Sequence, residues 1–223
     1  RRSRRAASAR RLGDGRQRRE RWSAVTAVVN PLGRARCQAP AGVSASPTTT
    51  EEAVALINAL PKPMNVACFV EALARPLYIN ATNSPFSLQP ALSDASPRVF
   101  IKLERLWASV VIDGDGSYLL EFGYRPPTSE MTSVKGELKF PLYAPVAPSA
   151  PYDRVRSGPT TSCGPCHYNE QRADAMGFAG AFDSIAFRPR PKSLVSVESL
   201  LMENVNCRFN RTAHPCEILS AAF

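Results

Sequence analysis

The sequence has no apolar run of the ~18 residues that a membrane-spanning helix requires. It also has only two histidines in 223 residues. The first absence predicts that no part of the mature chain crosses a bilayer. The second leaves hydrolytic catalysis without an obvious general base, because no Ser–His–Asp arrangement can be recognised. Together these absences favour a protein that is not an enzyme.

A basic patch outside the N-terminal region is lacking as well. The net charge is +9, but residues 1–21 hold ten arginines and two acidic residues and carry +8 of it, which leaves +1 for the rest. A nucleic-acid-binding domain carries its charge on a folded face. We therefore expect no nucleic-acid partner, and we interpret residues 1–36 as a disordered basic segment. A basic arm that binds nucleic acid is the alternative.

Six cysteines are present, and an even number is typical of proteins from oxidising compartments. Residues 22–30 form a short apolar run after the arginines, which is the order of a secretory signal. Both features predict an exported protein, located in the periplasm, on the outer surface or outside the cell. If Cys163 and Cys166 serve another purpose, the natural disulfide pairs are Cys37–Cys68 and Cys207–Cys216.

Between residues 64 and 145 the apolar residues recur with the period of two that is typical of β-strands. In the segment 134–140 apolar and charged residues alternate strictly, which predicts one buried and one solvated face. The absence of intervening helical patterns indicates a small antiparallel sandwich or barrel. The expected strands are residues 65–70, 77–81, 98–103, 106–112, 118–124 and 133–142.

The remaining segments divide the chain into four parts: a basic segment at 1–36, a linker with a short helix at 37–63, the β-domain at 64–145, and a C-terminal segment at 146–223. Helices are expected at residues 50–60, 168–177 and 194–205, with Thr50 and Ser193 as N-caps of the first and last. In the last helix the residues expected to share one face are Leu194, Val197, Leu201 and Val205. The fold class is therefore mainly β, with a short helical, disulfide-stapled C-terminal region.

The C-terminal segment contains the sequence Cys163-Gly164-Pro165-Cys166-His167. Two thiols at this spacing can reach the two vinyl groups of one haem, and the adjacent histidine can bind its iron. Here the chain resembles the c-type cytochromes. The resemblance implies thioether bonds at Cys163 and Cys166, an axial iron ligand at His167, and an electron-transfer role with a redox partner protein. Residues 37–223 also resemble uncharacterised exported bacterial proteins that pair a β-domain with a C-terminal CxxCH segment.

A single haem leaves the sixth coordination position of its iron open. The candidates are Met176, Met202 and His214, and we favour Met176, which follows His167 by nine residues. A methionine ligand would raise the reduction potential and suit electron transfer.

Three other interpretations of the cysteines stay open. Zinc could be bound by Cys163, Cys166, Cys207 and Cys216, with His167 or His214 as substitutes. Cys-Gly-Pro-Cys is also the redox pair of thioredoxins, although that use needs a strand before it and a helix after it. Finally, all six cysteines could be structural, in a non-enzymatic β-rich surface or binding protein.

Overall fold

The computed structural model describes residues 37–83, 96–187, 189–209 and 213–223. One compact unit spans Arg36–Phe223. The basic segment expected at 1–36 lies outside the described residues. None of the described helices has the length and apolar character needed to span a membrane.

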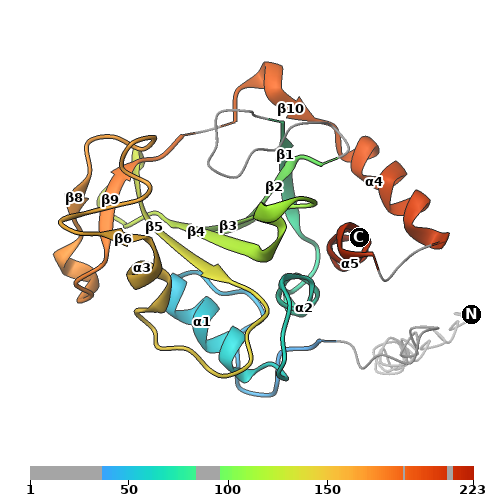
Figure 1. Cartoon of the computed structure of the whole chain (residues 1–223), viewed down its shortest axis with the longest axis horizontal. Coiled ribbons are helices and arrows are strands. Elements are labelled where there is room, and N and C mark those ends of the chain that lie inside the picture. Colours follow the sequence, from blue (N-terminus) through green and yellow to red (C-terminus); the bar gives the residue numbers. More distant parts are fainter. Residues whose placement is uncertain (1–36, 84–95, 188, 210–212) are drawn as a thin grey trace, which may run out of the picture. The chain divides into compact units, whose positions relative to one another are not determined.

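Eight strands form one antiparallel sheet in the order β10-β1-β2-β3-β4-β5-β9-β8, so the prediction of a mainly antiparallel β fold is confirmed (Figure 1). A separate hairpin consists of β6 (Arg156–Ser157) and β7 (Thr160–Thr161). The strands of the large sheet are β1 (Tyr78–Thr82), β2 (Arg98–Leu103), β3 (Leu106–Val111), β4 (Leu119–Tyr124), β5 (Thr132–Lys139), β8 (Gln171–Arg172), β9 (Phe182–Ile185) and β10 (Leu194–Val195).

The C-terminal segment 146–223 completes both edges of this sheet. Strand β9 pairs with β5, and β10 pairs with β1. The boundary expected at residue 145 therefore falls inside one compact unit, and strands on both sides of it form the same sheet.

The sheet has one apolar face, formed by every second residue of the central strands. The register places Ala108 opposite Ile101 and Phe122, and it places Leu120 opposite Leu138. These side chains belong to the main core together with buried residues of four of the five helices, α1, α2, α4 and α5. In Figure 1, α1 and α2 lie on the same side of the sheet. The helices are α1 (Thr50–Ala59), α2 (Val66–Ala72), α3 (Ala150–Val155), α4 (Val197–Asn206) and α5 (His214–Ala222).

Helix α1 lies where the sequence predicts a helix, although its cap is one residue earlier. The Thr49 side chain accepts a hydrogen bond from the backbone N–H of Glu52, and Thr50 is fully buried. The N-cap position satisfies one of the amides that have no partner within the helix. Val54 and Ile57 face the core as expected.

The expected strand at residues 65–70 is wrong, because this segment forms helix α2. The Asn65 side chain accepts from the N–H of Cys68 and caps the helix. Nearly every residue of α2 is buried, so the segment shows no polar–apolar alternation from which its type could be read. Phe69 packs edge-on against Phe122, with ring centroids 6.2 Å apart.

The expected helix at residues 168–177 is also wrong. Strand β8 (Gln171–Arg172) pairs there with β9, and a short 3-10 helix follows at Asp174–Met176. Gly177, at φ +73°, ends this turn in the left-handed region that glycine tolerates.

The third expected helix begins later than predicted. Leu194 and Val195 form β10, and Ser196 rather than Ser193 caps helix α4. Pairing with β1 takes Leu194 out of the helix. The four side chains expected to share a face are 40–51% exposed, whereas Leu200 is fully buried and meets the core.

The structure has both disulfides considered above, Cys37–Cys68 and Cys207–Cys216. The first ties the N-terminal end of the described chain to helix α2. The second joins the end of α4 to α5. Cys163 and Cys166 are free thiols.

Candidate functional site

The sequence Cys163–His167 lies in a long connection between α3 and β9, which also contains the β6–β7 hairpin. The carbonyl of Cys163 accepts hydrogen bonds from the N–H groups of Cys166 (3.1 Å) and His167 (2.8 Å). The five residues therefore form a single tight turn. This turn brings the backbone of the two cysteines and the histidine close together, although the segment is neither a regular helix nor a strand.

Glu170 stabilises the turn through hydrogen bonds to Thr161. Its carboxylate accepts from the N–H of Thr161 at 2.8 Å and from the Thr161 hydroxyl. The Thr161 hydroxyl oxygen in turn accepts from the N–H of Cys163 at 3.1 Å. A side chain at Gly164 would place its Cβ 3.1 Å from a Glu170 oxygen, so the glycine leaves room for this carboxylate.

The two thiols differ in their surroundings. Cys166 is exposed, whereas Cys163 is partly buried. Burial raises the pKa of the Cys163 thiol to about 11; the hydrogen bond from Thr161 and the charge of Lys135 oppose this, and the carboxylates of Glu121 and Glu137 add to it. Cys163 is therefore a protonated thiol at neutral pH, with no activation as a nucleophile.

The imidazole of His167 has a defined proton position. Its Nδ1 lies 2.8 Å from the carbonyl oxygen of Ile185. A carbonyl only accepts, so Nδ1 carries the hydrogen and Nε2 keeps its lone pair. Burial, and then the positive charge of Lys135, lower the pKa of His167, which keeps the ring neutral. A histidine ligand held by Nδ1–H···O=C with a free Nε2 is the usual arrangement in metal sites.

Lys135 lies beneath the motif and is 8% exposed. Its Nζ donates to the carbonyls of Ser133 (2.8 Å), Ser184 (2.8 Å) and Ile185 (3.1 Å). The carbonyl oxygen of Ile185 therefore accepts hydrogen bonds from both Lys135 Nζ and His167 Nδ1. Burial lowers the pKa of Lys135 to about 8, and the charge of Asp183 acts in the opposite direction.

The solvated face expected for the segment 134–140 is therefore wrong at Lys135. Only Lys139, at the end of β5, is fully exposed among the charged residues of that strand. Lys135 is buried at the β5–β9 pair, where its ammonium group donates to carbonyls of both strands.

The polar face of the sheet continues from Lys135 towards β2. Arg98 donates to Glu121 and forms an ion pair with it, and the Ser109 hydroxyl donates to the same carboxylate at 3.1 Å. Arg98 and Ser109 are buried. The charges of Arg98 and Glu121 act on the pKa of His167 in opposite directions, after burial and Lys135, so this charged row lies near the motif. The sequence did not predict this row of Arg98, Ser109 and Glu121. The one sequence signal for it is that polar residues occupy every second position of adjacent strands.

The residues considered as sixth ligands lie in other surroundings. Met176 packs against a small apolar cluster of Val134, Tyr152 and Ala181. Met202 is 61% exposed on α4. His214 Nε2 is 3.1 Å from the carbonyl of Ser117, and its ring stacks on Tyr118. Among the described residues, no hydrogen bond or ring contact joins any of these three to His167.

The four-cysteine zinc site is not formed. Cys207 and Cys216 are bonded to each other and provide no thiolates. In Figure 1, α4 and α5 lie at the opposite end of the sheet from β8 and β9. Across the described part of the chain, no group of three or more His, Cys, Asp or Glu residues could hold a metal ion.

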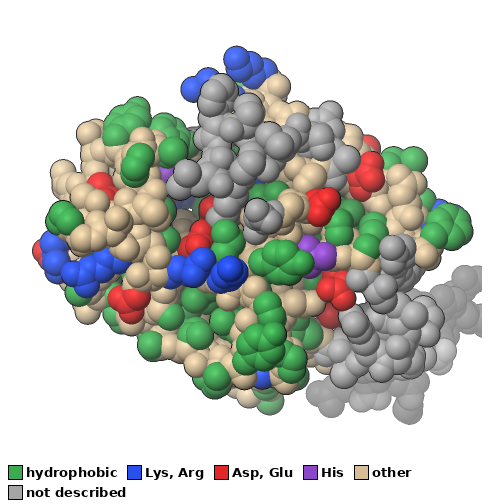
Figure 2. Space-filling model, viewed as in Figure 1, with side chains coloured by type: hydrophobic (Ala, Val, Ile, Leu, Met, Phe, Trp, Pro, Cys, Tyr) green, Lys and Arg blue, Asp and Glu red, His purple; other side chains and the backbone are tan. Residues whose placement is uncertain are grey.

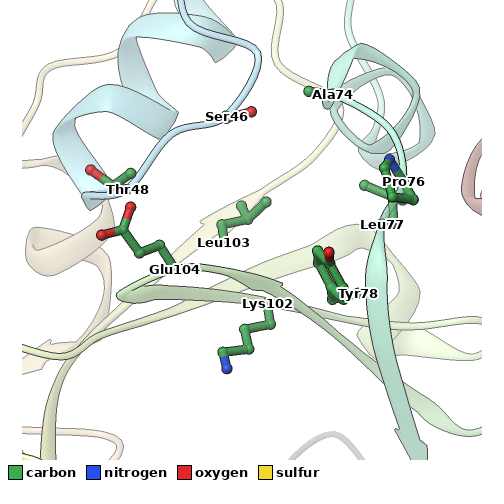
Figure 3. Close-up of a pocket in the computed structure, with 9 residues that line it drawn as sticks. All are labelled: Ser46, Thr48, Ala74, Pro76, Leu77, Tyr78, Lys102, Leu103 and Glu104. Atoms are coloured by element: carbon green, nitrogen blue, oxygen red, sulfur yellow. The ribbon is translucent and has the colours of Figure 1, made fainter.

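Two cavities lie away from the motif. One of about 180 Å³ lies beside the β2–β3 turn, where Tyr78, Leu103 and Glu104 border it (Figure 3). This volume is below the ~300–1,000 Å³ typical of small-molecule sites. The other lies between α4 and α5, next to Val205 and Phe223. Apolar side chains reach the face shown in Figure 2 in several separate patches.

The donor groups at the motif are of the kinds that a c-type haem uses. It provides two unpaired thiols in one turn and an imidazole with a free Nε2 lone pair. The Phe187 ring lies 5.1 Å from the His167 ring, and Tyr168 lies 5.9 Å from Phe187. Both aromatic side chains are more than half exposed and offer apolar surface beside the imidazole.

Comparison with known proteins gives no match. No family model matches the sequence, and neither the curated proteins nor the solved structures include one with significant similarity.

Proposed function

We propose that the protein is an exported carrier of one c-type haem, attached through Cys163 and Cys166 and bound at iron by His167. The observation that carries this proposal is the proton position of His167. Because Nδ1–H is held by the carbonyl of Ile185, Nε2 is the lone pair that faces a ligand, within the same turn as two free thiols.

The distribution of cysteines supports the same proposal. Four of the six are used in two disulfides that stabilise other parts of the fold. The pair that remains is the one at the spacing a haem requires. The two disulfides are also what an oxidising compartment allows, which is compatible with export.

An electron-transfer role with a protein partner is part of the proposal. A bound haem would supply one-electron redox chemistry. The protein's own residues hold the imidazole, and Tyr168 and Phe187 provide exposed rings at which a partner could approach. Lys135 and Glu170 fix the segments on either side of the motif.

The test is expression of the full chain, directed to the periplasm of a host with a cytochrome c maturation system. We expect a red protein whose haem stays with the polypeptide after acid–acetone extraction. The double variant C163A/C166A should lose this covalent retention. Colourless wild-type protein with two titratable thiols would refute the haem and leave the β-rich binding protein as the interpretation.

The second histidine is a matched control for the ligand. H167A should change the absorption of the haem, because the iron loses its imidazole. H214A should leave it unchanged, since His214 is engaged with Ser117 and Tyr118. If both variants have the wild-type spectrum, His167 is not the ligand.

A further inference from the structure

We propose that, before any haem is attached, Cys163 and Cys166 form a thiol–disulfide couple in which Cys166 reacts first and Cys163 resolves. The couple rests on the geometry of the two thiols and not on the haem. It would act on low-molecular-weight disulfides of the glutathione class.

The turn brings the two cysteines within reach of each other. The N–H of Cys166 donates to the carbonyl of Cys163 at 3.1 Å, which closes a four-residue turn. The ends of such a turn lie less than about 7 Å apart between Cα atoms. A disulfide needs about 4.4–6.8 Å. The bond can therefore form with a small adjustment of the loop, in which Pro165 is exposed.

Unequal access sets the order of reaction. Cys166 is exposed at the surface of the turn, whereas Cys163 faces the polar side of the sheet. An incoming disulfide can therefore meet the sulfur of Cys166 without displacing other residues. The backbone N–H of Cys163 donates to the hydroxyl of Thr161. Thr161 is buried, and its hydroxyl donates in turn to Glu170.

The chemistry has two steps. The Cys166 thiolate attacks one sulfur of the external disulfide, forms a mixed disulfide and releases one external thiolate. Cys163 then loses its proton to solvent and attacks the Cys166 sulfur, which forms the Cys163–Cys166 bond and releases the second external thiolate. The cysteine pair loses two electrons, and the external disulfide gains them.

This order is the reverse of that in an activated Cys-x-x-Cys site, in which a lowered pKa makes one cysteine the nucleophile. Here the pKa of Cys163 is raised from an ordinary value of 9.0 to about 11. The thiolate fraction at pH 8 is then about a hundredfold lower, and the greater nucleophilicity of a more basic sulfur recovers about tenfold. Cys163 should therefore react about ten times more slowly than a thiol with the ordinary pKa, which adds to the order that access sets.

The first experiment measures that ratio directly. The haem-free full chain is reduced mildly, so that peptide mapping still finds both structural disulfides, and is then given a short pulse of iodoacetamide. We expect Cys166 to be labelled faster than Cys163, as read by mass spectrometry, because Cys166 is the exposed thiol. Equal labelling, or faster labelling of Cys163, would overturn the order.

The second experiment separates the two steps with oxidised glutathione. Wild-type protein should end with the Cys163–Cys166 disulfide and no bound glutathione. C163A should accumulate glutathione on Cys166, and C166A should remain mostly unmodified. If C166A is modified as fast as C163A, the assignment of the first thiol is wrong. If the wild type keeps its glutathione, Cys163 does not resolve and the couple is wrong. Neither result depends on whether haem is ever attached.

Discussion

On one face of the sheet Phe122 and Leu138 pack against helices, whereas on the other Lys135 and Glu121 lie close to the loop that carries the two free cysteines. Both faces come from the same strands, since residues 135 and 138 lie on opposite sides of β5. One face is stabilised by apolar contacts, whose strength does not depend on the orientation of the groups. The other depends on hydrogen bonds and ion pairs whose partners must be placed individually.

This difference predicts how each face responds to change. Loss of apolar volume costs stability wherever the helices cannot close the gap. Loss of a polar partner leaves a buried group without its hydrogen bond. The apolar face should therefore determine global stability, and the polar face should determine the local state of the motif.

The largest effect is expected from Phe69→Ala on the apolar side. Phe69 is fully buried and packs edge-on against Phe122, so truncation leaves a cavity between α2 and the sheet. The free energy of unfolding should fall by about 3–5 kcal/mol. Urea unfolding followed by circular dichroism measures this. A loss below about 1 kcal/mol would mean that α2 contributes little to the core.

The second effect, on the polar side, is expected from Lys135→Met. The change keeps the length of the side chain but removes the donor to the carbonyls of Ser133, Ser184 and Ile185. We expect a loss of about 1–3 kcal/mol. Lys139→Met is the matched control, because Lys139 is on the same face of the same strand and is exposed. Equal losses in the two variants would show that the buried ammonium group does not join β5 to β9.

Much of the apolar face could be predicted from the sequence. The strands expected at 98–103 and 106–112 are present with nearly the same bounds, because the period of two is a local property of each strand. Helix α2 could not be recognised because Glu71 is the single charged residue of its short apolar segment, which is too few to reveal a period. The cap at Asn65 was the only local signal that could have identified it.

The polar face could be predicted only in part. The five residues 163–167 are adjacent in the chain, so their chemistry is readable without a structure. The residues that hold them are not adjacent. Lys135 bonds to carbonyls about fifty positions away, and Arg98 reaches Glu121 across two strand pairs. No periodic pattern encodes such contacts, because they depend on the order of strands in the sheet.

A pH-dependent effect is expected from His167 in the haem-free chain. Its pKa is lowered from 6.5 by burial and by Lys135, so the unfolded chain takes up the proton more readily. Stability should therefore be unaffected by this group above pH 6.5 and should decrease as the pH falls from 6.5 through the lowered pKa. The slope cannot exceed about 1.4 kcal/mol per pH unit for one proton.

Two variants isolate the contribution of His167. Between about pH 7 and pH 5, wild type and H214Q should lose more stability than H167Q, as measured by urea unfolding at each pH. If H167Q follows the wild-type curve throughout this range, the imidazole is not held neutral by its surroundings.

The smallest effect on stability, and the most local, is expected from Glu170→Gln. The amide keeps one accepting oxygen but replaces the other with a donor, so it can no longer accept from both the N–H and the hydroxyl of Thr161. We expect a local cost of about 0.5–1.5 kcal/mol. This corresponds to a roughly two- to tenfold faster alkylation of Cys163, since one factor of ten is about 1.4 kcal/mol. Glu130→Gln, in an exposed ion pair with Arg125, is the control and should change neither quantity. Unchanged labelling of Cys163 in the Glu170 variant would mean that the hairpin alone positions the turn. Faster labelling without a change in urea unfolding would show that the polar face controls the motif independently of the core on the opposite side of the sheet.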